Sequence, residues 1–251
     1  MARHYGAFDT SWHLSMPEQH RLLPLPIALY AKGIQRYGFH GLAFQSAMRQ
    51  LARHAPTLAG GRVVLAHLGG GSSLCAVHDG RCVNTTMGMT PLGGVSMSTR
   101  SGSLDPGVIL HLQRSLGMSP QVLDCTLWRE SGLKGVSGES GDMRVLLASQ
   151  SQHAHRAIAV YVAGIVQGIA MIAASMGGID ALAFSGGIGM HAASVRGSIA
   201  EALGWIGWVI DDGLNQRSAA EISRPKSSVR TFVLAVDEEF EMADAVAERV
   251  D

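Results

Sequence analysis

The sequence lacks most features that mark secreted, nucleic-acid-binding or membrane proteins. Only three of its 251 residues are cysteine (Cys75, Cys82 and Cys125), too few for a disulfide framework, which indicates a reducing compartment. Lys plus Arg equals Asp plus Glu at 20 each, so no net charge attracts nucleic acid or an anionic membrane. The N-terminal stretch MARHYGAFDTSWH has no apolar core of a signal peptide. We expect a cytoplasmic protein with no nucleic-acid or membrane partner.

One long apolar run, residues 157–176, is long enough to cross a bilayer. It contains Gln167, has no belt of flanking aromatic residues, and is followed at once by the strand-like run IDALAFSGG. A helix that is apolar nearly all round is also typical of a deeply buried central helix. We therefore predict a buried helix here.

The remaining pattern alternates strands and helices. Asp79-Gly80 is a hairpin turn, which places Cys82 opposite Val77 and only diagonal to Cys75, a poor geometry for a disulfide. Asp105 and Pro106 suit the start of a helix. The predicted strands are 62–68, 72–78, 81–87, 179–185 and 229–236, and the predicted helices are 105–117, 142–150, 153–176, 190–204 and 237–250. This order predicts an α/β fold with a mixed sheet.

Two of these strands end in glycine-rich turns, AHLGGGSS at 66–73 and AFSGGIGMH at 183–191. Free backbone N–H groups at a glycine turn that leads into a helix can face a bound anion. Neither turn matches the P-loop or the dinucleotide-binding fingerprint. Two tight turns without a ligand and two halves of a phosphate cradle both fit the pattern.

An ordered series of motifs covers nearly the whole chain: FDTSWHLSMPEQ, RYGFHG, HLGGGSSLCAVHDGRCVNTTMGMTPLGG, STRSGSLDPGVI, SGDMR, SGGIG and VDEEFEMA. The series resembles the acetate/propionate/butyrate kinase family of the actin-like, sugar-kinase-like ATPase superfamily. The resemblance implies an actin-like ATPase (ribonuclease H-like) domain with a mixed sheet and flanking helices, essentially the second domain of the two-domain acetate kinase fold. It implies ATP-dependent phosphorylation of acetate or a related short-chain carboxylate, and the reverse transfer to ADP.

The chemistry of that reaction gives the matched residues their roles. A carboxylate is already ionised at neutral pH, so the site needs hydrogen-bond donors and cations around the transferred phosphoryl group rather than a strong base. The resemblance assigns this work to Arg100 in STRSG and to His40 in GFHG. Alone, Arg100 reads equally as a surface arginine in a loop and His40 as a turn histidine bonded to the backbone.

The resemblance also implies a magnesium and nucleotide site. Mg²⁺ bound with ATP takes one or two carboxylates, and the matched acids are Asp9 and Glu238, which aligns better than Glu239. Alternatively, Glu238 and Glu239 bind no metal and are simply acidic residues in the first turn of a helix, where the helix dipole favours negative charge. The implied ATP/ADP contacts are the first loop, His67, Leu68, Gly69, Gly70 and Gly71; the adenosine segment, Asp142, Met143 and Arg144; and the second loop, Gly187, Ile188, Gly189, Met190 and His191. His67 reads equally as a residue packed at a strand end.

The chain departs from the family pattern in its loops. Gly70 stands where the family has an asparagine, Phe44 where it has a second histidine, and Met190 and His191 where it has an acid and an amide. The chain also begins where the family's first domain is ending. We expect residues 1–10 to be a remnant of the first domain, 11–235 the second domain, and 236–251 a helix that returns to the first.

Because donors from the first domain have no counterpart here, we expect impaired activity of the chain alone. A nucleotide-binding remnant without catalysis, or a regulatory partner of a full-length kinase, are the alternatives. The second domain is the family's dimerisation domain, so a homodimer is expected. The last predicted helix places Phe240, Ala243, Val246, Ala247 and Val250 on one face, and we expect this apolar face, Phe240 and Val246 among it, to be exposed.

Overall fold

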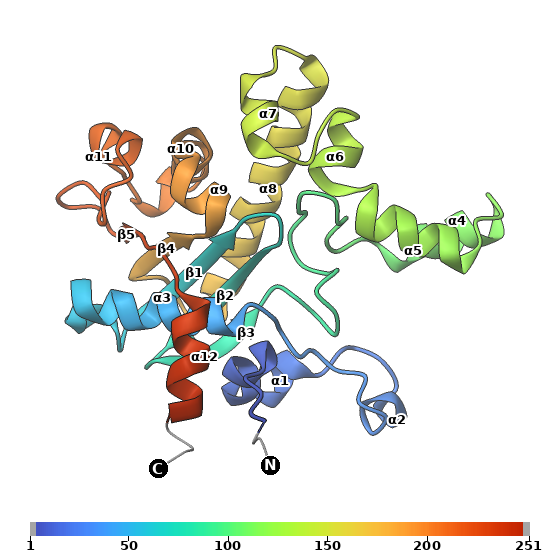
Figure 1. The fold of residues 1–251 in the computed structure, drawn as a ribbon, viewed down its shortest axis with the longest axis horizontal. Coiled ribbons are helices and arrows are strands. Elements are labelled where there is room, and N and C mark those ends of the chain that lie inside the picture. Colours follow the sequence, from blue (N-terminus) through green and yellow to red (C-terminus); the bar gives the residue numbers. More distant parts are fainter. Residues whose placement is uncertain (1–3, 248–251) are drawn as a thin grey trace.

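A five-stranded mixed sheet forms the centre of the protein in a computed structural model, which describes residues 4–247 (Figure 1). The strand order is β3-β2-β1-β4-β5. Strands β1, β2 and β3 form an antiparallel meander, whereas β4 and β5 lie parallel to β1. The strands are β1 Arg62–Leu68, β2 Ser72–His78, β3 Arg81–Thr85, β4 Ala181–Ser185 and β5 Arg230–Val233. The predicted mixed sheet is confirmed.

The strands are apolar along their length because both faces of the sheet are covered. Alternate residues of β1 point to opposite sides: Val64 and Ala66 face one core, and Val63 and Leu65 face the other. The first core lies against α8 (Gln152–Ala174) through Tyr161 and other buried side chains. The second lies against α3 (Gly41–His54).

Short helices surround these layers. The other α-helices are α1 Glu18–Arg21, α2 Ile27–Tyr30, α4 Pro106–Arg114, α5 Pro120–Arg129, α6 Gly132–Ser137, α7 Met143–Ala148, α9 Gly186–His191, α10 Ala193–Ala202, α11 Asp212–Gln216 and α12 Glu238–Ala247. Three 3-10 helices are η1 Asp9–Ser15, η2 Pro56–Leu58 and η3 Gly204–Ile206. Asp105 caps α4 as predicted, by accepting a hydrogen bond from the Gly107 N–H.

Three predicted element boundaries need correction. The helix predicted from 190 to 204 begins instead at Gly186 as α9, breaks at Ala192 and continues as α10. The strand predicted over 81–87 ends at Thr85, and that over 229–236 ends at Val233. The long apolar helix α8 is long and apolar enough to cross a membrane, but only one face is buried. Its outer face leaves Val160 47% and Met171 55% exposed.

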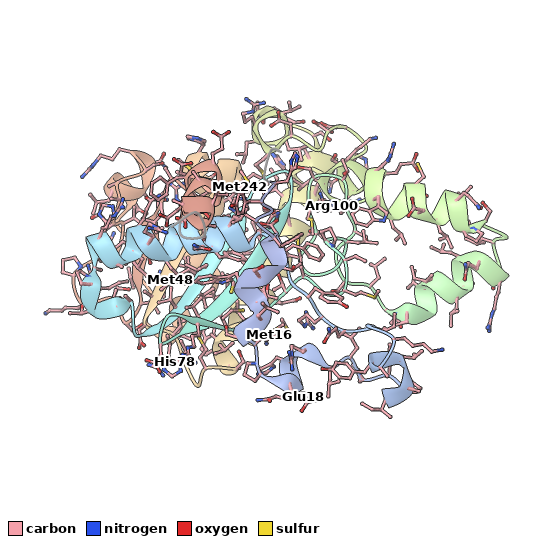
Figure 2. The ribbon with its side chains drawn as sticks, turned by 60° about the horizontal axis from the view of Figure 1, so that its bottom comes forward. Met16, Glu18, Met48, His78, Arg100 and Met242 are labelled. Carbon is pink, nitrogen blue, oxygen red and sulfur yellow. The ribbon has the colours of Figure 1, made fainter. Side chains whose placement is uncertain are left out.

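The last helix, α12, lies across α3, as the positions of Met242 and Met48 show (Figure 2). Its anchor is charged: Arg49 of α3 pairs with Glu241 at 2.9 Å and with Asp244. Glu241 is fully buried, while Phe240 remains 46% exposed beneath the Arg49 guanidinium. The apolar exposure predicted for Phe240 is thus present, whereas Val246 is half-buried. Val250, predicted on the same face, lies outside the described residues.

Candidate functional site

The two glycine-rich turns meet at one edge of the sheet. Strands β1 and β4 are parallel neighbours, so their carboxyl ends, where the turns begin, lie side by side. A Cβ on Gly69 would lie 3.7 Å from the Gly187 backbone nitrogen. At Gly186, φ is +74° and a Cβ would lie 2.6 Å from the Leu68 carbonyl oxygen. Only glycine allows the turns to cross this closely.

A cavity of about 730 Å³ opens between these turns and α7. Eight of the residues predicted to contact the nucleotide line it: Gly69, Gly70, Asp142, Met143, Arg144, Gly187, Ile188 and His191. Five others, not foreseen from sequence, complete the wall: Ser98, Thr99, Gly141, Leu147 and Ala192. The cavity is therefore built from four segments that are far apart in the chain, around residues 69–70, 98–99, 141–147 and 187–192.

The remaining predicted contacts lie beside the cavity rather than on its wall. The Leu68 side chain is fully buried in the core, so only its backbone is available to a ligand. Gly189 is buried, and Met190 packs against the core. His67 and Gly71 lie on the opposite side of the first turn, close to the His40 ring.

Asp142 and Arg144 are engaged with each other. The Asp142 carboxylate caps α7 by accepting from the Arg144 N–H at 2.9 Å, and it pairs with the Arg144 guanidinium at 2.6 Å. These hydrogen bonds lower the pKa of Asp142 to about 2. Asp142 thus stays ionised and holds the first turn of α7 against the cavity.

Behind the first turn, His40 and Arg100 converge on Gly71. A Cβ on Gly71 would lie 3.1 Å from His40 Nε2 and 3.6 Å from Arg100 Nη1. The Arg100 guanidinium is held by the Pro91 carbonyl at 3.0 Å and by the face of Trp128. Arg100 is half-buried, so it is not the surface arginine that the loop sequence alone allowed. The turn 69–71 thus has the cavity on one side and these two donors on the other.

The two histidines of this cluster are neutral at physiological pH. Burial first, and the neighbouring His40 second, lower the pKa of His67 to about 4. Burial is also the largest cause that lowers the pKa of His40, with Asp9 opposing it and Arg100 adding to it. The Ser73 hydroxyl lies 2.9 Å from His40 Nδ1 and can donate to it, which leaves a proton on Nε2, facing Gly71. His67 is held in the same way, 3.1 Å from the Ser185 hydroxyl.

Asp9 and Glu238 come together from the two ends of the described chain. The Asp9 carboxylate accepts from the backbone N–H groups of His40 and Leu42, both at 3.3 Å, so it caps α3 and fixes the turn that carries His40. Burial first and the charge of Asp9 second raise the pKa of Glu238. Glu239, the alternative, is exposed. Two neighbouring carboxylates, one of them disfavoured in its charged form, are a donor set that fits a divalent cation.

Sequence reasoning missed one residue that shapes this edge, Arg196. It is fully buried and donates to the carbonyl groups of Gly189 and Met190 and to the Asn215 side chain. Burial lowers the pKa of Arg196 to about 10, which leaves it charged at neutral pH. Nothing in its surroundings in the sequence, SVRGS, distinguishes it from an exposed helix residue.

Comparisons with known proteins agree with this geometry. Residues 2–244 match the model of the acetokinase family. The acetate kinase of Methylocella silvestris is 45% identical over 234 residues, which are 93% of this chain and 58% of that relative. The acetate kinase structure from Porphyromonas gingivalis has a TM-score of 0.93 at 32% identity and covers 98% of this chain and 64% of its own. A propionate kinase structure from Francisella tularensis has a TM-score of 0.89 at 34% identity and covers 94% of this chain and 62% of its own.

The matches cover almost all of this chain but only part of each relative. The chain spans about three fifths of the length of the curated relatives that it matches. Family model, sequence relatives and solved structures agree on the same assignment over that part. The chain belongs to the acetokinase family and has the actin-like ATPase fold of the acetate kinases.

Proposed function

We propose that the chain provides the nucleotide-binding half of an acetate kinase, which transfers the γ-phosphoryl group of ATP to acetate or a related short-chain carboxylate and catalyses the reverse transfer to ADP. The observation that carries the proposal is the position of turn 69–71. One side of this turn lines the cavity of about 730 Å³, and the other lies against His40 and Arg100. A nucleotide in the cavity would direct its phosphates over the turn toward these two donors.

The side chains suit phosphoryl transfer to a carboxylate. The nucleophile is already an anion, so the barrier arises from bringing two anions together and from charge on the transferred group. The Arg100 guanidinium supplies permanent positive charge, and His40 Nε2–H supplies a neutral donor. Pro91, Trp128 and Ser73 hold both side chains in place before the substrate arrives.

Asp9 and Glu238 would hold the Mg²⁺ that accompanies ATP. When bound, the ion neutralises phosphate charge. In the protein itself, the Asp9 carboxylate fixes the turn that carries His40. Glu238 presents a half-buried carboxylate near Asp9. Glu238 rather than Glu239 takes this role in the proposal because Glu238 is half-buried and the charge of Asp9 helps to raise its pKa, whereas Glu239 is exposed.

The division into parts remains a proposal as well. Residues 11–235 would form the second domain, with 1–10 and 236–251 belonging to the first. The packing of α12 on α3 through the buried Glu241 supports a fixed position for that helix. Substrate-binding donors from the part of the relatives that this chain does not match would complete the site. A cytoplasmic location belongs to the same proposal.

The outer face of α8 supports a homodimer. An apolar groove runs along α8 and α10, with Ile158, Val162 and Val166 on its wall. Val160 and Met171 leave further apolar surface on the same helix. Light scattering of the purified chain tests this expectation, and a monomer at micromolar concentration would contradict it.

Gly187→Val tests whether the cavity binds nucleotide. A Cβ at Gly187 meets no atom within 4 Å and φ is not positive there, so the variant should fold while its side chain occupies the cavity. We expect titration calorimetry to detect Mg-ATP and ADP binding to the chain and at least about a tenfold loss in the variant. Gly204→Val, at a similarly open position outside the cavity, should bind as the parent does.

The outcomes separate the candidate functions. Unaltered nucleotide affinity in a folded Gly187→Val variant would show that the cavity serves another ligand. No nucleotide binding by the parent chain would favour the regulatory-partner alternative. Nucleotide binding without acyl phosphate formation, even with the missing part of a relative supplied, would favour the non-catalytic remnant.

A further inference from the structure

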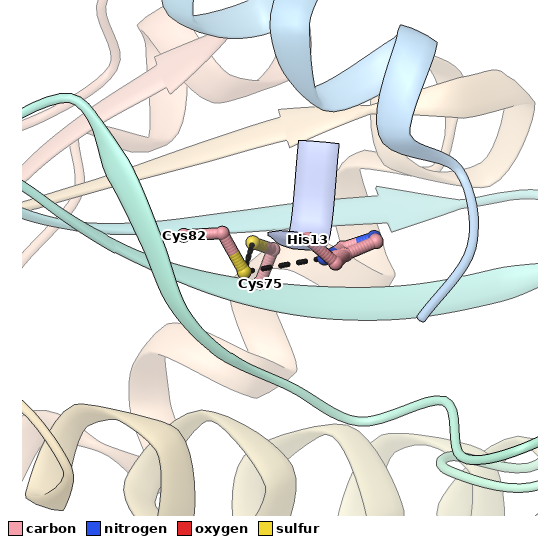
Figure 3. Close-up of side chains that lie close together, drawn as sticks. All are labelled: His13, Cys75 and Cys82. Carbon is pink, nitrogen blue, oxygen red and sulfur yellow. Dashed lines mark hydrogen bonds between the residues drawn. The ribbon is translucent and has the colours of Figure 1, made fainter. Parts of the chain in front are cut away.

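A buried cluster of His13, Cys75 and Cys82 lies on the sheet face opposite α8 (Figure 3). The Sγ atoms of the cysteines are 3.5 Å apart, and His13 Nδ1 is 3.2 Å from Cys82 Sγ. The three donor atoms all lie within 4.8 Å of one another, and each residue is at most 2% exposed. The cluster has no part in the site described above.

The sheet register opposes a disulfide between the two cysteines. Cys82 pairs with Val77 and Cys75 pairs with Thr85, so the cysteines are diagonal neighbours with a bulge between the pairs. Diagonal neighbours have Cα atoms about 7–8 Å apart, beyond the usual reach of a disulfide. Two sulfurs bonded to one metal ion at about 2.3 Å lie about 3.5 to 4 Å apart. The observed separation therefore fits a shared ion without movement of the strands.

The His13 ring is oriented as a metal ligand. Its Nε2 lies 3.0 Å from the Phe39 carbonyl oxygen, which can only accept, so Nε2 carries the proton. The lone pair on Nδ1 then faces Cys82. A metal-binding histidine typically donates its second nitrogen to a carbonyl or carboxylate in this way. Gly38 packs against the ring so closely that a Cβ would lie 2.5 Å from it, which locks the orientation.

A neighbouring donor is directed at the cluster. The buried indole N–H of Trp12 makes no hydrogen bond of normal geometry within residues 4–247, and it faces the Cys75 sulfur, whose charged form it favours. Trp12 packs against the same apolar cluster as Cys75 and Cys82. A metal-bound thiolate carries negative charge and would give this N–H an acceptor.

We propose that His13, Cys75 and Cys82 bind a single thiophilic cation, Cu(I), with three-coordinate geometry. Soft thiolate ligands select Cu(I) and Zn²⁺. Structural zinc is almost always four-coordinate, and the cluster offers three side-chain ligands, each at most 2% exposed to solvent. Each thiol that binds releases its proton to solvent.

The ion would also fix the neighbouring part of the kinase site. His13 lies on η1, one turn after Asp9, and its Nε2–H holds the carbonyl of Phe39, the residue before His40. Bound metal would therefore tie η1 and the His40 turn to strands β2 and β3. Hydrogen exchange at residues 9–15 and 39–42 should slow when the metal binds.

Copper competition tests the site. The reduced chain is titrated without oxygen against Cu(I) held by the chromogenic chelator bathocuproine disulfonate, and the loss of the chelator's colour measures transfer. We expect one Cu(I) per chain, with Zn²⁺ unable to displace it. The Cys75→Ser/Cys82→Ser variant should lose at least about a hundredfold in affinity. Cys125→Ser, which changes the exposed cysteine, should bind like the parent.

Circular dichroism establishes that each variant is folded. Should the double variant unfold, X-ray absorption of the loaded parent decides the question, because the site requires two sulfur donors and one nitrogen. The proposal would be overturned if the folded parent took no Cu(I) from the chelator, or if the folded double variant took as much as the parent. It would also be overturned if Zn²⁺ displaced Cu(I), or if X-ray absorption found a donor set other than two sulfurs and one nitrogen.

Discussion

The resemblance implies an asparagine at the position of Gly70, and the structure leaves room for that side chain. A Cβ at this position meets no atom within 4 Å, and Gly70 lines the cavity. Gly70→Asn should therefore fit without strain and add one amide donor toward a bound phosphate. We expect a several-fold rise in Mg-ATP affinity, about 1 kcal/mol for a hydrogen bond, measured by titration calorimetry. Gly70→Ala, which adds no donor, should show no gain, and an equal gain in both variants would contradict the reasoning.

Glu238 is expected to make the stability of the protein depend on pH. Burial and the charge of Asp9 raise the pKa of Glu238, so the folded state holds the proton more tightly than the unfolded chain. The free energy of unfolding then falls as pH rises through the ordinary value of 4.5 toward the raised one. Glu238→Gln should stabilise the nucleotide-free chain at pH 7 by up to about 1 kcal/mol, and this gain should shrink toward pH 4.

The control for this prediction is Glu239→Gln, because Glu239 is exposed. It should leave both stability and binding unchanged in urea denaturation and nucleotide titration. Glu238→Gln should weaken ATP binding only when Mg²⁺ is present. Destabilisation by Glu238→Gln at pH 7 would mean that its charge has a favourable partner.

The site residues that belong to a sequence motif could be predicted, whereas those that reach the site only through the fold could not. Asp9, His40, Arg100 and Glu238 were identified through their motifs, and the structure brings them near one another in pairs. The serines that position the histidines, Ser73 and Ser185, were not singled out. Their role depends on the cross-strand register, which aligns His67 with both of them.

At the scale of elements, a single buried side chain, Arg196, contributes much of the stability of the C-terminal end of α9. Arg196 on α10 donates to the Gly189 and Met190 carbonyl groups at 2.8 and 2.9 Å, and it also bonds Asn215. Arg196→Met keeps the length of the side chain but takes its donors away from the Gly189 carbonyl and Asn215 Oδ1, while the Met190 carbonyl keeps the Ser218 hydroxyl. We expect a loss of roughly 2–4 kcal/mol in urea denaturation, because unpaired buried groups cost about 1–3 kcal/mol each and do not add fully.

The same substitution should also weaken nucleotide binding, since α9 forms one wall of the cavity. Arg156→Met on α8 is the matched control, because Arg156 is exposed, and it should change stability by less than about 0.5 kcal/mol. A stable Arg196→Met variant would show that water replaces the guanidinium.

The elements themselves were predictable to different degrees. The strands and α8 follow from continuous apolar runs, which few other structures can bury. The start of helix α9 was predicted at residue 190 rather than at Gly186, because its glycines disfavour a helix locally. In the fold, contact with Leu68 and the hydrogen bonds from Arg196 stabilise this helix. The extent of burial of α8 was overestimated, since composition does not show that one face meets no neighbour within residues 4–247.

At the scale of the whole molecule, the topology explains where the site lies. The parallel pair β1 and β4 ends at one edge, and the segments 98–100 and 140–144 reach that edge from other parts of the chain. The order of motifs predicted this fold, but only the structure places the cavity and the His40–Arg100 pair on opposite sides of turn 69–71. The remaining question at this scale is what the unmatched two fifths of the relatives contribute.

Complementation answers that question. By itself the 251-residue chain should form acyl phosphate slowly, because each absent donor in such a site costs about a hundred- to a thousand-fold in rate. Fusion to the unmatched part of a relative such as the Methylocella silvestris acetate kinase should raise the rate of hydroxamate-detected acyl phosphate formation by at least about a hundredfold. Arg100→Ala in the fusion should remove that gain, since it deletes the guanidinium beside Gly71. Arg129→Ala, at an exposed position on α5, should retain it. Rapid acyl phosphate formation by the chain alone would show instead that its own loops, with Gly70, Met190 and His191, already make a complete site.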